Sequence, residues 1–145
     1  MKIVINADHG GFGLSDEAVI RYNELLGRKV WCIKHEIFNY TTYSLVPPEQ
    51  RIDKGNEPHG APRTWHEMTK DEKDAYNKAY RNTTFYDRDI ARNDPLLIQV
   101  VEEMGEKAND RYSDLHIVEI PDDVEWQIEE YDGNEWIAEK HRTWS

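Results

Sequence analysis

Cysteine is almost absent from this sequence, with Cys32 as the single example among 145 residues. One thiol cannot form an intramolecular disulfide framework or a thiolate metal cage. Long apolar runs are also missing, so no stretch is long enough to span a bilayer, and no secretory signal opens the chain. We therefore expect a protein of a reducing cytoplasm that does not insert into a membrane.

Basic residues are outnumbered, since 18 Lys and Arg stand against 29 Asp and Glu, for a net charge of −11. Affinity for DNA depends on cationic contacts to phosphate, so this balance disfavours direct nucleic-acid binding. Two interpretations of the acidity remain open. It keeps a small protein soluble, or it occupies the nucleic-acid groove of another protein by imitating DNA.

The chain opens with a strand, a glycine loop and a helix. Lys2–Asn6 is mostly apolar and predicts a short buried strand, which Gly10–Gly13 cannot continue. Ser15 is a favoured N-cap residue, so a helix is expected over 15–26. A second strand over 29–34 would complete a β–α–β unit with parallel strands and a right-handed crossover.

Two helices and a loop are indicated further along. Prolines and glycines interrupt residues 47–65, which we interpret as a long irregular surface loop. Thr69 and Glu72 have the spacing of a capping box, so a short helix is expected to follow. Asp94-Pro95 is an N-cap followed by proline at the first helical position, which predicts a helix over 95–108.

The C-terminal part has the pattern of a β-hairpin around the turn dipeptide Asp132-Gly133. A two-residue turn would place Ile128 opposite Ile137. A three-residue turn would instead move Trp136 onto the face of Trp126 and Ile128, and the pattern leaves both registers open.

These elements predict a single α/β domain over residues 1–145, in two or three layers, with a mostly parallel sheet and a C-terminal hairpin that extends or caps it. The hairpin and an apolar sheet edge are compatible with a homodimer. The expected sheet strands are 2–6, 29–34 and 115–120, and the expected covering helices are 15–26 and 95–108.

The glycine loop is the main candidate for a binding site, because uncommitted N–H groups point out of a loop between a strand and a helix. Phe12 offers a ring for stacking, and Arg88, Arg92 and Arg142 would supply positive charge if they converged on the loop. The alternatives are a plain tight turn and arginines paired with nearby carboxylates. The candidate ligand-binding residues are Asn6, Gly10, Gly11, Phe12, Gly13, Ser15, Arg88, Arg92 and Arg142.

No metal, cofactor or catalytic group is predicted. His35-Glu36 and His66-Glu67 lack the second histidine of a zinc-protease helix, and His59 has no complete ligand set around it. The carboxylates of Asp122–Glu139 are too evenly spread to nominate an acid/base pair, and they look like the solvated face of a hairpin. The residues therefore favour a non-enzymatic role.

The opening Met1–Ile5, followed by Asp8-His9-Gly10-Gly11-Phe12, resembles the start of the B-type ribose-5-phosphate isomerases. In that family an Asp-His pair at this point contacts the sugar phosphate, which would implicate Asp8 and His9. The family also uses a cysteine base near the middle of the chain beside a glycine-rich anion loop. Here Cys32 comes earlier and no such loop follows it, so the resemblance ends at about Leu14.

A second resemblance covers both ends of the chain. The opening around Gly10–Ser15, the helix start at Asp94-Pro95, and the ending from Ile120–Trp126 through Tyr131–Gly133 to His141–Trp144 are similar to a group of small uncharacterised bacteriophage proteins. The resemblance implies an accessory protein that acts in the cytoplasm of an infected bacterial host.

Three functions follow as hypotheses. The first is binding of a small anionic or nucleotide-like ligand, such as a host immune signal that the protein sequesters. The second is inhibition of a host protein by an acidic surface, as a DNA mimic would do. The third, a phosphosugar isomerase-like activity, comes from the isomerase resemblance alone.

Overall fold

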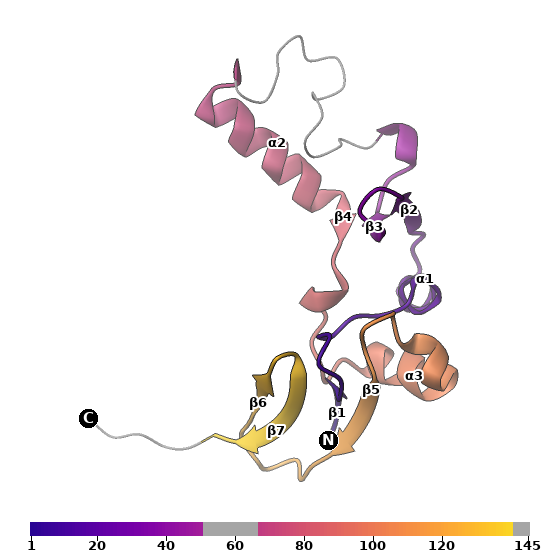
Figure 1. Cartoon of the computed structure of the whole chain (residues 1–145), viewed down its shortest axis with the longest axis vertical. Helices are drawn as coiled ribbons and strands as arrows, with labels where there is room; N and C mark the ends of the chain where they lie inside the picture. Colours follow the sequence, from indigo (N-terminus) through magenta and orange to yellow (C-terminus); the bar gives the residue numbers. More distant parts are fainter. Residues whose placement is uncertain (51–66, 141–145) are drawn as a thin grey trace, which may run out of the picture. The chain divides into compact units, whose positions relative to one another are not determined.

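The computed structural model describes residues 1–50 and 67–140. Its contacts group into two compact units, each of which contains antiparallel β-structure (Figure 1). Unit 1 consists of Met1–Arg28 with Asp87–Ser145, and unit 2 consists of Lys29–Tyr86.

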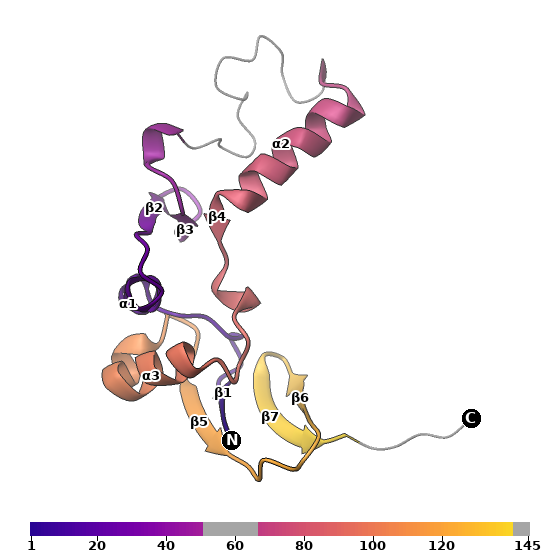
Figure 2. The same cartoon turned by 180° about the vertical axis from the view of Figure 1, so that it is seen from behind.

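Unit 1 is organised around a two-stranded antiparallel sheet. β1 (Lys2–Asn6) pairs with β5 (Leu115–Glu119), and Val4 lies opposite Ile117. In both views the β1–β5 pair lies between helix α3 and the C-terminal hairpin (Figures 1 and 2). The other elements of unit 1 are α1 (Asp16–Leu25), η3 (Asp87–Asp89), α3 (Pro95–Met104), η4 (Gly105–Ala108), β6 (Trp126–Tyr131) and β7 (Asn134–Glu139).

The predicted parallel sheet is wrong, because every strand pair in the described residues is antiparallel. The predicted strand at 29–34 corresponds to β2 (Trp31–His35), which pairs with the next strand along the chain and not with β1. A short turn between neighbouring strands costs less loop entropy than a crossover through a helix. The apolar run of β1 suggested a parallel strand, but it reflects burial on both faces: Ile3, Val4 and Ile5 are all buried within an antiparallel pair.

The two main helices of unit 1 are confirmed together with their N-caps. The Ser15 hydroxyl accepts a hydrogen bond from the Ala18 N–H at 3.1 Å, and an Asp94 carboxylate oxygen accepts one from the Leu96 N–H at 2.8 Å. The predicted helix over 95–108 ends as an α-helix at Met104 and continues as the 3₁₀ turn η4. Asp94 also accepts a bond from the Tyr22 hydroxyl at 2.7 Å, and burial together with this bond raises the pKa of Tyr22 to about 12.

The C-terminal hairpin is present, and its register follows the two-residue turn. Asp132 has φ of 50° and Gly133 has φ of 86°, so both central residues of the turn adopt the positive φ that a type I′ turn requires. Ile128 therefore lies opposite Ile137, and the three-residue alternative is wrong.

Unit 2 contains a three-stranded antiparallel sheet in the order β2-β3-β4. The Thr69 hydroxyl accepts a hydrogen bond from the Glu72 N–H at 3.2 Å, which confirms the predicted capped helix. Of the predicted loop at 47–65, the part from residue 51 lies outside the described residues. The remaining elements of unit 2 are β3 (Tyr40–Ser44), η1 (Pro48–Gln50), α2 (Lys70–Asn82) and β4 (Thr84–Phe85).

The core of unit 1 is formed where β1 meets the two helices. Its apolar side chains come from the strand, from the end of the glycine loop and from one face of each helix. The most buried are Ile3, Val4, Leu14, Ala18, Val19, Leu97, Val100 and Ala108.

Candidate functional site

Asn6, the last residue of β1, holds three segments of unit 1 together. Its side-chain nitrogen donates to the carbonyl oxygens of Asp8 at 2.7 Å and Gly133 at 2.8 Å. Its side-chain oxygen accepts from the Asp114 N–H at 2.8 Å and, at 3.3 Å, from the Asp8 N–H. Both donors and both acceptor positions of this fully buried amide are therefore used internally. Asn6 positions the loop and the hairpin turn and leaves no group for a ligand.

Only some of the backbone N–H groups in and after the glycine loop form hydrogen bonds within the protein. The Leu14 N–H donates to an Asp87 carboxylate oxygen at 2.9 Å, and the Ser15 N–H donates to the Ala108 carbonyl at 2.9 Å. Within the described residues, the N–H groups of Gly10–Gly13 have no hydrogen-bond acceptor. Gly10 is exposed and Gly11 is half-buried, so this part of the loop reaches the surface, with the Gly133 turn lying against the Gly11 nitrogen.

Ser15 and Gly13 make their contacts inside the protein and not with the pocket. The Ser15 hydroxyl donates to the Lys107 carbonyl at 2.6 Å in addition to capping α1. Gly13 is buried against Asp110, whose carboxylate occupies the space that a Cβ atom would need, and its carbonyl accepts from the Ser113 hydroxyl at 2.8 Å. Neither residue faces the pocket described next.

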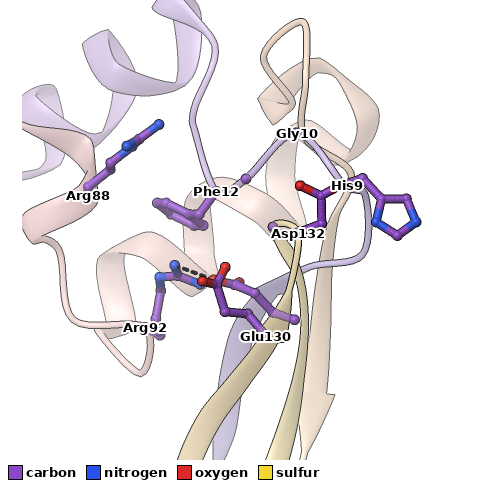
Figure 3. Close-up of a pocket in the computed structure, with 10 residues that line it drawn as sticks. His9, Gly10, Phe12, Arg88, Arg92, Glu130 and Asp132 are labelled. Carbon is purple, nitrogen blue, oxygen red and sulfur yellow. Dashed lines mark hydrogen bonds and ion pairs between the residues drawn. The ribbon is translucent and has the colours of Figure 1, made fainter.

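A pocket of about 480 Å³ opens beside the loop, and all of its walls belong to unit 1 (Figure 3). The loop, the segment at η3 and the hairpin turn meet there although they are far apart in the sequence. Five of the predicted site residues are brought together in this way. The pocket is lined by His9, Gly10, Gly11, Phe12, Arg88, Arg92, Glu130, Asp132, Gly133 and Glu135.

Arg92 forms the floor of the pocket together with Phe12 and Glu135. Its guanidinium lies 3.7 Å from the centre of the Phe12 ring, and it donates to both oxygens of Glu135 at 2.6 and 2.9 Å. Glu135 also accepts from the Asn6 N–H at 2.8 Å. Phe12 is 5% exposed, so its ring packs under Arg92 and offers no open stacking face. Arg92 is therefore paired with a carboxylate, which was the alternative to its supplying positive charge for a ligand.

Arg88 differs from Arg92 in its surroundings. It is exposed at the edge of the pocket, on η3, and makes no ion pair or side-chain hydrogen bond with another described residue (Figure 3). Arg142, the third predicted arginine, lies outside the described residues. Arg88 is therefore the cation of this pocket that can meet an anionic group.

The hairpin contributes residues that sequence reasoning missed. The Gly133 backbone lies against the loop so closely that an added Cβ atom would sit 2.5 Å from both the Gly11 nitrogen and the His9 oxygen. This contact brings the exposed carboxylates of Glu130 and Asp132 to the pocket wall opposite Arg88 (Figure 3). The turn dipeptide is visible in the sequence, but nothing local indicates that the turn packs on the glycine loop.

Asp87 is a half-buried acid next to this site, on the residue before Arg88. Burial raises the pKa of its carboxyl above the usual 3.8, the hydrogen bond from the Leu14 N–H opposes the shift, and the Asp110 charge adds to it. The native state therefore binds the Asp87 proton more tightly than the unfolded chain does. The resulting contribution to stability is present below pH 3.8 and is lost as the pH rises through the native pKa.

Asp87→Asn tests this linkage, because asparagine keeps an acceptor for the Leu14 N–H and has no charge to bury. We expect the variant to be at least as stable as the wild type at neutral pH, with its advantage shrinking as the pH falls toward 4. Urea denaturation at both pH values measures this. Asp89→Asn removes the same charge from the exposed neighbour and serves as the control. A loss of stability for Asp87→Asn that is equal at both pH values would contradict the expectation.

The residues suggested by the isomerase resemblance do not form a recognisable constellation. A carboxylate oxygen of Asp8 accepts from the His9 N–H at 2.7 Å, and both residues are exposed in unit 1. Cys32 lies on β2 in unit 2. In residues 1–50 and 67–140, no three His, Cys, Asp or Glu side chains lie together as metal ligands would.

Comparisons with known proteins supply no relative. No family model, no curated protein and no solved structure matches this chain. Among the described residues, no helix is both long enough and apolar enough to cross a bilayer.

Proposed function

We propose that this chain is a non-enzymatic bacteriophage protein that binds a small nucleotide-like ligand in the unit 1 pocket. The observation that carries the proposal is the meeting of the Gly10–Phe12 loop and Arg88 in one pocket. The loop contributes amides without internal acceptors, and η3 contributes an exposed guanidinium.

The anionic part of the ligand would lie between Arg88 and the amides of Gly10 and Gly11. Backbone N–H groups of a glycine loop bind phosphate oxygens well, and a guanidinium matches phosphate with paired donors. Arg92 does not supply this charge, because both of its terminal nitrogens already donate to Glu135. Arg92 instead forms a part of the pocket surface that Glu135 holds in place.

The opposite wall decides which anions fit. Glu130 and Asp132 are exposed carboxylates that would repel a ligand with negative charge alone, such as inorganic phosphate. They would accept hydrogen bonds from the amino groups of a nucleobase, as Glu and Asp do from the cytosine amine. A nucleotide has both kinds of group, and a host signalling nucleotide fits the phage setting implied by the two ends of the chain.

Arg88→Ala is the direct test of this proposal. Losing one charge-assisted phosphate contact is expected to weaken nucleotide binding by about tenfold or more. Isothermal titration calorimetry against linear and cyclic mono- and dinucleotides, with inorganic phosphate as the reference anion, measures the affinity. Nucleotides should bind more tightly than phosphate.

Arg21→Ala provides a charge-matched control, because Arg21 lies on α1 outside the pocket and pairs with Glu103 at 3.1 Å. It should leave nucleotide affinity unchanged. Equal binding by the wild type and Arg88→Ala would overturn the proposal, and so would the absence of binding across the panel.

A further inference from the structure

The β6–β7 hairpin has two faces of different character. The strand register places Trp126, Ile128, Glu130, Glu135, Ile137 and Glu139 on one face. Glu135 on this face bonds to the Asn6 backbone and to Arg92, so it is the inner face. The sequence-based expectation that the hairpin carboxylates form its solvated side is therefore wrong for Glu135.

The opposite, outer face presents aromatic side chains. Tyr131 is 74% exposed and Trp136 is 44% exposed. They are diagonal neighbours across the two strands, since Tyr131 pairs with Asn134 and Trp136 pairs with Glu129. Trp and Tyr are the residues most enriched at the centres of protein interfaces.

Glu129 lies directly opposite Trp136 and two residues before Tyr131 on the same face, and its carboxylate is held in position. Its carboxylate oxygens accept from the Gln127 side-chain nitrogen at 3.0 Å and from the Trp136 indole N–H at 3.1 Å. A carboxylate fixed beside two aromatic rings suits a guanidinium or ammonium group, which can pair with the carboxylate and lie over a ring.

The charge of unit 1 favours the same kind of partner. Unit 1 has nine Lys and Arg against 21 Asp and Glu, whereas unit 2 has nine against eight. The whole acidic excess of the chain thus belongs to the unit that carries the hairpin. Such a field attracts basic segments and raises their rate of association.

The geometry points to the outer face of the β6–β7 hairpin, centred on Glu129, Tyr131 and Trp136, as a docking surface for a basic, arginine-rich segment of a partner protein. The cation of the partner pairs with Glu129 and lies over the Trp136 ring, and the acidic field of unit 1 steers it there. This surface is separate from the pocket, which takes its hairpin residues from the turn and the inner face.

A short arginine-rich peptide is the probe, with the same peptide carrying citrulline in place of arginine as its uncharged counterpart. Binding is followed by calorimetry and by the NMR signal of the Trp136 indole N–H. We expect the arginine peptide to bind and the citrulline peptide to bind about tenfold or more weakly. Raising the salt from about 50 to about 500 mM should weaken binding without abolishing it, because the aromatic contact is not screened.

Two charge-matched variants distinguish binding at this surface from nonspecific electrostatic attraction between the basic peptide and the acidic protein. Glu129→Gln and Glu139→Gln remove the same charge from the outer and inner faces of one hairpin. Glu129→Gln and Trp136→Ala should each weaken the peptide by about tenfold, and Glu139→Gln should not. Equal losses for the two glutamate variants, equal binding of the citrulline peptide, or no binding at all would overturn the inference. Nucleotide affinity of Trp136→Ala should stay at the wild-type level, so failure of this surface and failure of the pocket are distinguishable.

Discussion

Replacing Glu135 by alanine is expected to lower the free energy of unfolding by about 3–5 kcal/mol, the usual effect of removing one partner of a buried ion pair. The Glu135 side chain is 9% exposed and that of Arg92 is 17% exposed. Without the carboxylate, the guanidinium keeps its charge in a poorly hydrated place against Phe12. The Asn6 N–H also loses its acceptor, which adds to the penalty.

Glu130→Ala is the matched control, because Glu130 lies directly across the hairpin from Glu135 but is exposed. Its effect should stay within about 0.5 kcal/mol. Glu135→Gln retains an oxygen for the Asn6 N–H and should fall between the two. Urea denaturation at neutral pH measures all three. A loss below about 1 kcal/mol for Glu135→Ala would show that the pair is as weak as one on the surface.

Gly133→Ala should cost about 2–4 kcal/mol, because backbone strain and a steric clash act together. Gly133 has φ of 86°, a conformation that side chains with a Cβ atom rarely adopt. The new Cβ atom would also lie 2.5 Å from backbone atoms of His9 and Gly11. Because these are backbone atoms, they cannot rotate away, so the hairpin turn must shift from the loop.

Gly27→Ala separates the two causes. Gly27 has a similar φ of 76°, but no atom lies within 4 Å of the Cβ position. It should therefore show the backbone penalty alone, about 1 kcal/mol. The amide NMR signals of Gly10 and Gly11 should move in Gly133→Ala and not in Gly27→Ala. Equal destabilisation of both variants would mean that the hairpin turn does not depend on its contact with the loop.

The two variants connect the stability of the protein to its proposed function. The pocket exists because the Gly133 turn is packed on the loop and because Glu135 is locked to Arg92. A ligand would thus meet walls that are already in place, which reduces the ordering cost of binding. We expect nucleotide affinity to fall with stability in Gly133→Ala, and to stay at the wild-type level in Gly27→Ala.

Local chemistry allowed several elements to be predicted from the sequence. Ser15, Thr69 and Asp94 cap the expected helices because a short polar side chain can reach the free N–H groups of the first turn. Asp132-Gly133 gives the hairpin because both residues tolerate positive φ. Each of these signals acts over three or four residues, and each was confirmed.

The sheet could not be predicted in the same way. A short apolar strand such as β1 has no feature that identifies its partner, and the strand nearest in sequence, β2, belongs to another unit. The true partner, β5, follows more than a hundred residues later and runs antiparallel. Burial of β1 by elements on both faces gave it the composition of a strand in a parallel sheet.

For the site, local residue preferences predict only the parts: a glycine loop between a strand and a helix, arginines able to bind anions, and a turn that contains glycine. How these parts are used depends on the contacts between segments that are far apart in the chain. In the folded chain Arg92 pairs with Glu135, and Arg88 stays exposed. The Asn6 side chain forms all of its hydrogen bonds internally, and one face of the hairpin points outward. An ion pair or a packed turn depends on which remote segments meet, and the residues next to each group in the sequence do not specify that meeting.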